Sequence, residues 1–124
     1  SIYRAILEGC AFEMRLNAET VRPFGIKINE LTVTGGGAKS ALWTQIKADI
    51  MGVPVYTLQN EDAGITGAAM LAMAALGITK DLEDAANITV KKKPPLYPDI
   101  RLSGVYDEKF NKYKKLYSLL KEVR

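Results

Sequence analysis

The stretch that decides the fold is LTVTGGGAKSALWTQIKADIMGVPV, residues 31–55. Residues 30–34 alternate and are rich in β-branched side chains, so they predict a strand. Three glycines follow, and Ser40 is then a favourable N-cap for a helix that runs to about residue 51. We expect that helix to place Leu42, Ile46 and Ile50 on one apolar face.

A second strand is predicted at residues 53–58, where Pro54 marks either an edge strand or the start of a strand. Two strands joined by one helix form a right-handed parallel unit. A small-residue helix should follow over about residues 63–76, with Ile65, Ala69, Ala72 and Leu76 in register. Two strands alone are too few for a stable open sheet, so further strands from elsewhere are expected.

The outer parts of the chain are mainly helical. Residues 2–22 predict a helix with Ile2, Ala5, Ile6, Gly9, Phe12 and Leu16 on its apolar side and Arg4, Glu8, Arg15 and Glu19 on its polar side. A turn of helix is expected at 81–86, an irregular proline-rich surface segment at 91–100, and a terminal helix at 103–123. That last helix carries an apolar seam of Tyr106, Phe110, Tyr113, Tyr117 and Leu120.

Composition excludes several classes of function. The chain has 124 residues, a formal net charge of +3, one cysteine and no histidine. The absence of histidine excludes a histidine-based catalytic triad and the usual zinc sites, and we expect no metal-ligating residues. The lysine clusters at 91–93 and 109–121 indicate solvated faces, so a nucleic acid is not an expected partner. The longest apolar stretch, residues 68–78, is too short to span a bilayer, so a membrane is not expected either. A lone Cys10 suits a reducing compartment, and the cytoplasm is the expected location.

The glycine turn matches neither familiar phosphate motif. Val33 stands where the P-loop pattern requires its first glycine, and Ser40 stands where the dinucleotide pattern requires its last. Even so, a glycine-rich turn between a strand and a helix exposes backbone N–H groups at the positive end of a helix dipole. From spacing alone, an anion site and a simple tight turn remain equally open.

A second cluster of small residues, EDAGITGAAMLA at 61–72, also lies between a predicted strand and a predicted helix. Gly64 and Gly67 would open that helix at the same sheet edge as the glycine turn. The two helix starts would then leave a slot in which a flat adenine ring could lie against backbone. Ordinary packing of small residues between helices is the alternative explanation.

Three blocks of the chain carry a resemblance to a known family: IYRAILEGCAFEMR at 2–15, the central block at 31–55, and EDAGITGAAMLA. Together they resemble the carboxyl-terminal part of the FGGY carbohydrate kinases, and the xylulokinase branch is the most similar. YPDIRLSGVYDEKFNKYKKLY, at 97–117, resembles the tail of that branch. The resemblance implies an α/β fold, a partial ribonuclease H-like or actin-like ATPase domain with α-β-α-β-α order, parallel strands and a carboxyl-terminal helix.

The resemblance also implies roles for individual residues. It points to Gly35, Gly36, Gly37 and Ala38 as backbone contacts of an adenine nucleotide, and to Ser40 as a nucleoside contact. Trp43 is expected to pack against the turn, Gln45 to hydrogen-bond locally, and Asp49 to make a structural hydrogen bond. Lys39 is expected to be solvated. No catalytic residue is expected here, because the family's general base belongs to earlier sequence.

On this interpretation, residues 1–124 are the carboxyl-terminal part of the second domain of a larger two-domain kinase. The parent reaction would transfer a phosphoryl group from ATP to a sugar hydroxyl, on D-xylulose or a related pentulose or polyol, with ATP/ADP and Mg²⁺ as cofactors. Two alternatives stay open: a non-catalytic structural module that self-associates, and a Rossmann-type nucleotide-binding domain. The first alternative predicts a homodimer, because a sheet that lacks partner strands should bury its open edge against a second copy.

Overall fold

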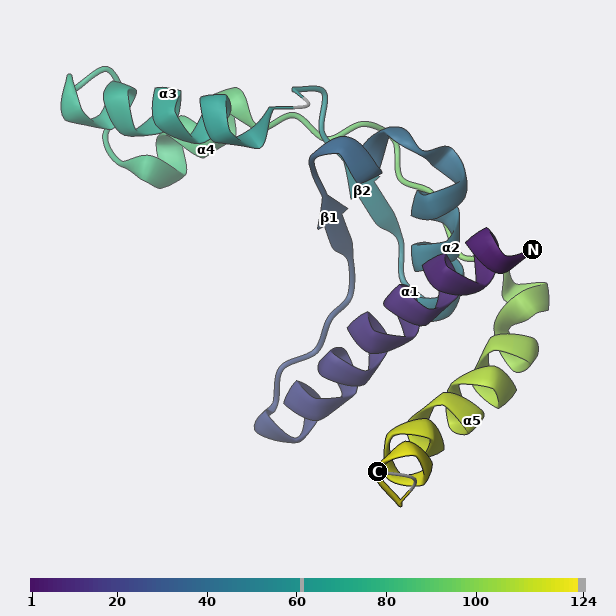
Figure 1. The fold of residues 1–124 in the computed structure, drawn as a ribbon. Helices are drawn as coiled ribbons and strands as arrows, with labels where there is room; N and C mark the ends of the chain where they lie inside the picture. Colours follow the sequence, from purple (N-terminus) through teal and green to yellow (C-terminus); the bar gives the residue numbers. More distant parts are fainter. Residues whose placement is uncertain (61, 123–124) are drawn as a thin grey trace.

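The structure is a computed structural model that describes residues 1–60 and 62–122 of the chain. Its order of elements confirms the predicted alternation of helices and strands (Figure 1). The helices and strands are α1 (Ile2–Val21), β1 (Leu31–Val33), α2 (Ala41–Met51), β2 (Val55–Thr57), α3 (Ala63–Ala75), α4 (Leu82–Thr89) and α5 (Ser103–Glu122). Short 3₁₀ helices occupy Arg22–Phe24, Gly36–Lys39 and Ile100–Leu102.

The two strands pair in parallel, as the α2 crossover between them requires. Leu31 lies opposite Val55, and Val33 lies opposite Thr57. Because both strands run the same way, their carboxyl ends meet at one edge, and both following loops start there. Pro54 precedes β2 and so marks the start of a strand.

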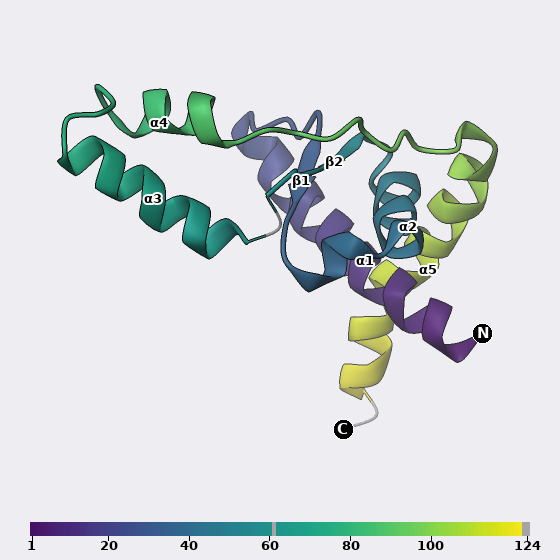
Figure 2. The same cartoon turned by 90° about the horizontal axis from the view of Figure 1, so that it is seen from above.

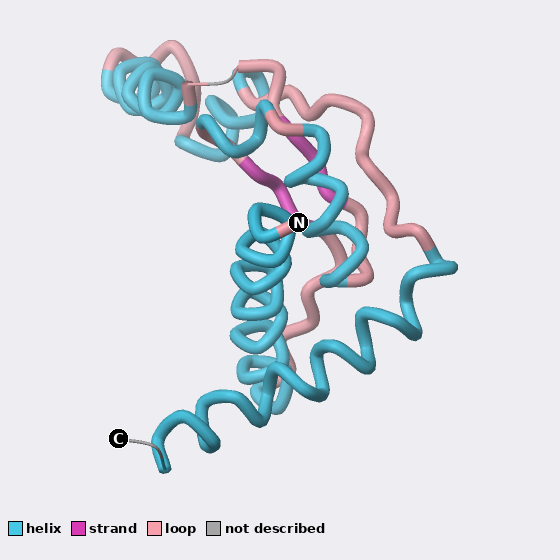
Figure 3. The backbone as a smooth tube through the Cα atoms, turned by 45° about the vertical axis from the view of Figure 1, so that its right-hand side comes forward, coloured by secondary structure: helices cyan, strands magenta, loops and turns pink. Residues whose placement is uncertain are grey.

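The proline-rich segment is less irregular than expected. Leu96 and Val55 exchange two backbone hydrogen bonds of 2.9 Å, and the N–H of Lys93 donates to the carbonyl of Thr57 at 2.8 Å. The segment therefore covers the outer edge of β2 in antiparallel direction, which protects an edge strand from unwanted pairing. Figure 3 shows this loop passing the strands on its way from α4 to α5.

Two side chains of α2 hold the end of that segment. The Asp49 Oδ1 atom accepts from the backbone N–H of Asp99 at 2.8 Å and from Gln45 Nε2 at 2.7 Å. Gln45 also donates to the carbonyl of Tyr97 at 2.9 Å. The expected structural role of Asp49 and the expected local hydrogen bond of Gln45 are both confirmed.

The hydrophobic core lies where α1, α2 and α5 meet. Its buried members are Ala11, Phe12, Ile46, Ile50, Tyr106 and Phe110. The ring of Phe12 stacks on Phe110 at 6.0 Å and meets Tyr106 edge-on at 6.2 Å between ring centroids. This confirms the first half of the predicted α5 seam, whereas Leu120 is exposed and the side chain of Tyr117 lies outside the described residues.

The predicted apolar face of α1 is partly wrong. Ile2, Ala5 and Ile6 are exposed, while Glu8, which the periodicity predicts on the polar side, is buried. The buried stripe is rotated because Glu8 receives three hydrogen bonds, from Arg4, Tyr106 and Lys109, at 2.9, 3.1 and 3.0 Å. A buried carboxylate with such partners is tolerated, and periodicity alone cannot foresee them.

The remaining corrections concern helices that lack a partner surface. Leu42 is exposed on α2. No described residue of α3 is buried, so no other described element fully covers the apolar face predicted from Ile65, Ala69, Ala72 and Leu76. The single turn expected at 81–86 is a longer helix, α4, capped by Asp81. As Figure 2 shows, α3 and α4 pack on each other and project from the rest.

No helix in the described part of the chain is long and apolar enough to cross a membrane.

Candidate functional site

The glycine turn leaves β1 at its carboxyl end and leads directly into α2. Gly35 adopts φ +78° and ψ −171°, a conformation that is essentially restricted to glycine. A short 3₁₀ helix, Gly36–Lys39, follows, and no side chain caps its N-terminus. The Ser40 hydroxyl then accepts from the N–H of Trp43 at 3.2 Å, which confirms Ser40 as the N-cap of α2.

Trp43 fixes the turn against α2, as the sequence predicted. A Cβ atom added to Gly37 would lie 3.2 Å from both Cδ1 and Nε1 of the indole, so only glycine allows this approach without displacement. Lys47 makes a cation–π contact with the same indole, because its Nζ lies 4.4 Å from the centroid of the Trp43 ring. Burial lowers the pKa of Lys47 below its usual value.

One hollow at this sheet edge, called here the larger hollow, lies between the glycine turn and the start of α3. Thr34, Gly35, Gly36 and Lys39 line one side, Asp62, Ala63 and Gly64 line the other, and the volume is about 550 Å³. Asp62 caps α3, because its Oδ1 accepts from the N–H of Ile65 at 3.0 Å. The predicted arrangement of two helix starts facing one another is therefore present.

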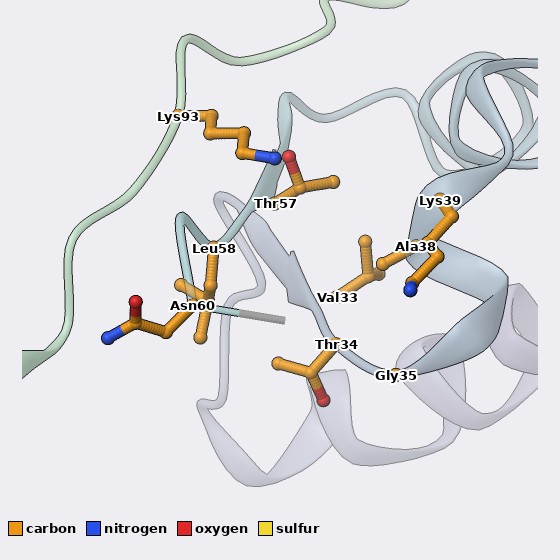
Figure 4. A pocket seen from close by; sticks show the side chains of 9 residues that line it. All are labelled: Val33, Thr34, Gly35, Ala38, Lys39, Thr57, Leu58, Asn60 and Lys93. Carbon is orange, nitrogen blue, oxygen red and sulfur yellow. The ribbon is translucent and has the colours of Figure 1, made fainter. Parts of the chain in front are cut away.

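The smaller hollow, of about 190 Å³, lies at the carboxyl ends of both strands (Figure 4). Its lining residues are Val33, Thr34, Gly35, Ala38, Lys39, Thr57, Leu58, Asn60 and Lys93. Lys39 enters it from the glycine turn and Lys93 from the proline-rich segment. Sequence reasoning missed Thr57, Asn60 and Lys93. Thr57 lies one residue before the end of the strand predicted at 53–58, so the rule that ligands bind at the carboxyl ends of parallel strands could have identified it. Lys93 reaches the hollow only because its segment returns antiparallel along β2.

The five residues singled out from the sequence are distributed as follows. Gly35 lines both hollows, Gly36 lines the larger one, and Ala38 lines the smaller one. Gly37 faces the Trp43 indole, and the Ser40 hydroxyl is used for capping, so neither lines a hollow. The exposed side chain of Lys39 borders both hollows.

The groups that the glycine turn presents to the hollows are mainly backbone groups. In residues 1–60 and 62–122 no group of three or more His, Cys, Asp or Glu side chains lies close enough to hold a metal. What the turn offers is backbone: a Cβ atom added to Gly35 or Gly36 would meet nothing within 4 Å, so a ligand can approach the main chain closely. The N-terminus of α2 adds the positive end of a helix dipole.

Comparison with known proteins gives the same family that the three sequence blocks resemble. Residues 1–76 match the C-terminal domain of the FGGY family of carbohydrate kinases. The xylulose kinase of Bacillus subtilis (strain 168) is 34% identical over 120 residues, which are 97% of this chain and 24% of that protein.

Two solved structures share the fold. Gluconate kinase from Lactobacillus acidophilus matches with a TM-score of 0.84 and 27% identity, over 96% of this chain and 24% of that one. Xylulose kinase from Rhodospirillum rubrum matches with a TM-score of 0.82 and 27% identity, over 98% of this chain and 25% of that one. The chain thus spans about a quarter of the length of these relatives and has the helices and parallel strands of their ribonuclease H-like, actin-like kinase domains. Sequence blocks, fold and family match agree, and the chain belongs to the FGGY family of carbohydrate kinases.

Proposed function

We propose that this chain supplies the adenine-nucleotide loop of an ATP-dependent carbohydrate kinase. The observation that carries the proposal is the glycine turn, which lies at the carboxyl ends of two parallel strands and faces the start of α3 across an open hollow. Ligands of open α/β sheets bind at this edge. Family membership supports a nucleotide as the ligand.

In this proposal the main chain performs the recognition. N–H groups at Gly35, Gly36, Gly37 and Ala38 are directed at phosphate and ribose oxygens, and the α2 dipole favours the negative charge. Ser40 contributes mainly by fixing the start of α2, because its hydroxyl already accepts from Trp43. Gly37 contributes by letting the indole lie against the turn.

The chemistry of phosphoryl transfer needs more than this chain. We place residues 1–124 in the carboxyl-terminal part of the second domain of a two-domain kinase, and we assign the sugar site and the general base to the other parts. Mg²⁺ would neutralise charge on the nucleotide phosphates, but the described residues hold no cluster suited to a metal, so its protein ligands belong elsewhere.

The proposed substrate is D-xylulose or a related pentulose or polyol. The B. subtilis relative is a xylulose kinase, and it matches nearly the whole chain. A structure described as a gluconate kinase shares the same fold over the same length. The sugar is therefore expected to be selected by residues outside this chain.

Calorimetric titration of the 124-residue chain with ADP and with NAD tests the proposal. ADP should give a saturable heat and NAD none, because the turn lacks the last glycine of a dinucleotide motif. Tighter binding of NAD would favour the Rossmann alternative and contradict the proposal. Sugar-dependent release of ADP by this chain alone would contradict the assignment of the general base to another part.

A further inference from the structure

Lys47 lies on α2 with its side chain almost fully enclosed. The residue is 7% exposed, although lysine is almost never buried unless a carboxylate pairs with it. In residues 1–60 and 62–122 no carboxylate forms an ion pair with Lys47. Burial lowers the pKa of its ammonium group, and a buried charge without such a partner costs stability. A contribution to the stability of α2 therefore does not explain this side chain.

The ammonium group of Lys47 lies on the indole of Trp43. Lys47 follows Trp43 by one helical turn, and side chains on a helix lean toward its N-terminus, so the ammonium returns over the indole. The Nζ atom lies 4.4 Å from the centroid of the Trp43 ring. Contacts between a cation and an aromatic ring are strongest where the cation is removed from water, as it is here.

The same indole meets the glycine turn. Its Cδ1 and Nε1 atoms lie 3.2 Å from the position of a Cβ atom added to Gly37. The backbone of Trp43 is fixed separately, because its N–H donates to the Ser40 hydroxyl at 3.2 Å. The orientation of the indole thus depends on its contacts with Gly37 and with Lys47, and Trp43 joins the buried ammonium to the main chain of the turn.

We propose that Lys47 is a positioning residue of the nucleotide site: its ammonium holds the Trp43 indole against Gly37 and so keeps the glycine turn in the conformation that binds phosphate. This inference rests on the proposed nucleotide-binding function. Lys47 lines neither hollow, so it acts through Trp43. A turn that adopts its binding conformation for only part of the time has an affinity reduced by that fraction.

The test compares Lys47→Met and Lys47→Arg by calorimetric titration with ADP. Methionine keeps an unbranched side chain without the charge, whereas arginine keeps a cation that packs on aromatic rings. Lys47→Met should weaken ADP by about tenfold, which is the loss equivalent to one desolvated contact between a cation and a ring. Lys47→Arg should retain the affinity to within about twofold, because it keeps that contact.

Thermal unfolding of the same variants separates positioning from a structural role. Lys47→Met should unfold at the same temperature as the unaltered chain or at a higher one, because removal of an unpaired buried charge offsets the lost contact with the indole. A structural residue would instead lose stability and affinity together.

Fluorescence gives a further readout, because Trp43 is the single tryptophan of the chain. Quenching by acrylamide should increase in Lys47→Met, as the indole leaves the turn, and should stay at the unaltered level in Lys47→Arg.

Lys114→Met is the matched control. The Nζ atom of Lys114 lies 4.8 Å from the centroid of the Phe110 ring on α5, and Lys114 lines neither hollow. The same substitution at this second contact between a cation and a ring should change neither the ADP affinity nor the quenching of Trp43.

Each contrary result bears on one level of the argument. An unaltered ADP affinity in Lys47→Met, or a loss that Lys47→Arg shares, overturns the role of Lys47 while the nucleotide site stands. A loss of affinity together with a lower unfolding temperature also overturns it, since Lys47 is then a structural residue. Failure of the unaltered chain to bind ADP overturns the proposed function itself, and the acrylamide measurement still decides whether Lys47 orients Trp43.

Discussion

At the scale of single residues, Gly35 decides the shape of the candidate site. Its φ of +78° with ψ of −171° turns the chain from β1 into the 3₁₀ helix, and a Cβ atom would strain this conformation even though the space around it is open. Gly36, the next residue, has equally open space and no positive φ. Substituting Gly35 and Gly36 in turn therefore tests backbone strain at Gly35, because steric crowding is absent at both positions.

We expect Gly35→Ala to lower the free energy of unfolding by about 1–3 kcal/mol, because alanine pays the strain of a glycine-only conformation. Gly36→Ala should leave the stability unchanged or raise it slightly, since alanine restricts the unfolded chain more than glycine does. Urea unfolding followed by circular dichroism measures both. Equal destabilisation by the two variants would show that the turn is not held by the conformation of Gly35.

At the scale of elements, the carboxylate of Glu8 joins α1 to α5. Arg4 on the same helix and Tyr106 and Lys109 on α5 all donate to it. Burial alone would raise the pKa of Glu8, but the hydrogen bonds from Lys109, Arg4 and Tyr106 outweigh burial and hold the pKa below its usual value. The charged form is thus favoured by folding.

The contribution of Glu8 to stability should therefore depend on pH. It is fully present above the unfolded-state pKa near 4.5 and is lost as the pH falls through the lower pKa of the folded state. Glu8→Gln should cost about 1–2 kcal/mol at pH 7 and flatten the acid limb of the stability curve.

Glu108→Gln is the control for Glu8, because Glu108 pairs with Lys112 at 2.7 Å on the exposed face of α5. Surface pairs of this kind contribute little, so this variant should change the stability hardly at all. Urea titrations between pH 3 and 7 give both curves. A Glu8→Gln variant with an unaltered acid limb would contradict the role assigned to Glu8.

At the scale of the whole molecule, α3 and α4 form an arm that projects from the other helices (Figure 1). Large apolar side chains of this arm are exposed. Ile65 and Leu71 on α3 are 70% and 61% exposed, and Leu76, which caps the carboxyl end of α3, is 75% exposed, although the helix is apolar around its circumference. Helices of this composition are normally buried. Among the described strands, β1 pairs only with β2, so no described strand pairs with its other edge.

We expect the 124-residue chain to self-associate through this arm, because water strongly disfavours contiguous apolar surface. Leu71→Glu should shift the mass measured by size-exclusion chromatography with light scattering toward the monomer. Leu119→Glu, a change of similar exposure near the end of α5, should leave the association intact. A monomer at every concentration, or a larger effect of Leu119→Glu, would contradict association through the arm.

The sequence by itself determined the elements and the turn between them. β-branched runs, the Ser40 cap, the αL glycine at position 52 and the small-residue block after β2 are local signals, so they specify strand, helix and turn without help from distant residues. The parallel pairing also followed from the sequence, because a single crossover helix permits little else. The family resemblance, carried by the same local blocks, gave the kinase class.

Only the tertiary structure decided which surfaces are buried and which residues meet. Glu8 is buried because α5, about a hundred positions later in the chain, brings Tyr106 and Lys109 to it. Lys93 reaches the sheet edge because its segment returns along β2. One side of α3 stays exposed because, in the described chain, α4 is the helix that packs on it and covers only part of its surface. Periodicity reports that a helix has an apolar side, but contacts between distant segments determine whether that side finds a partner.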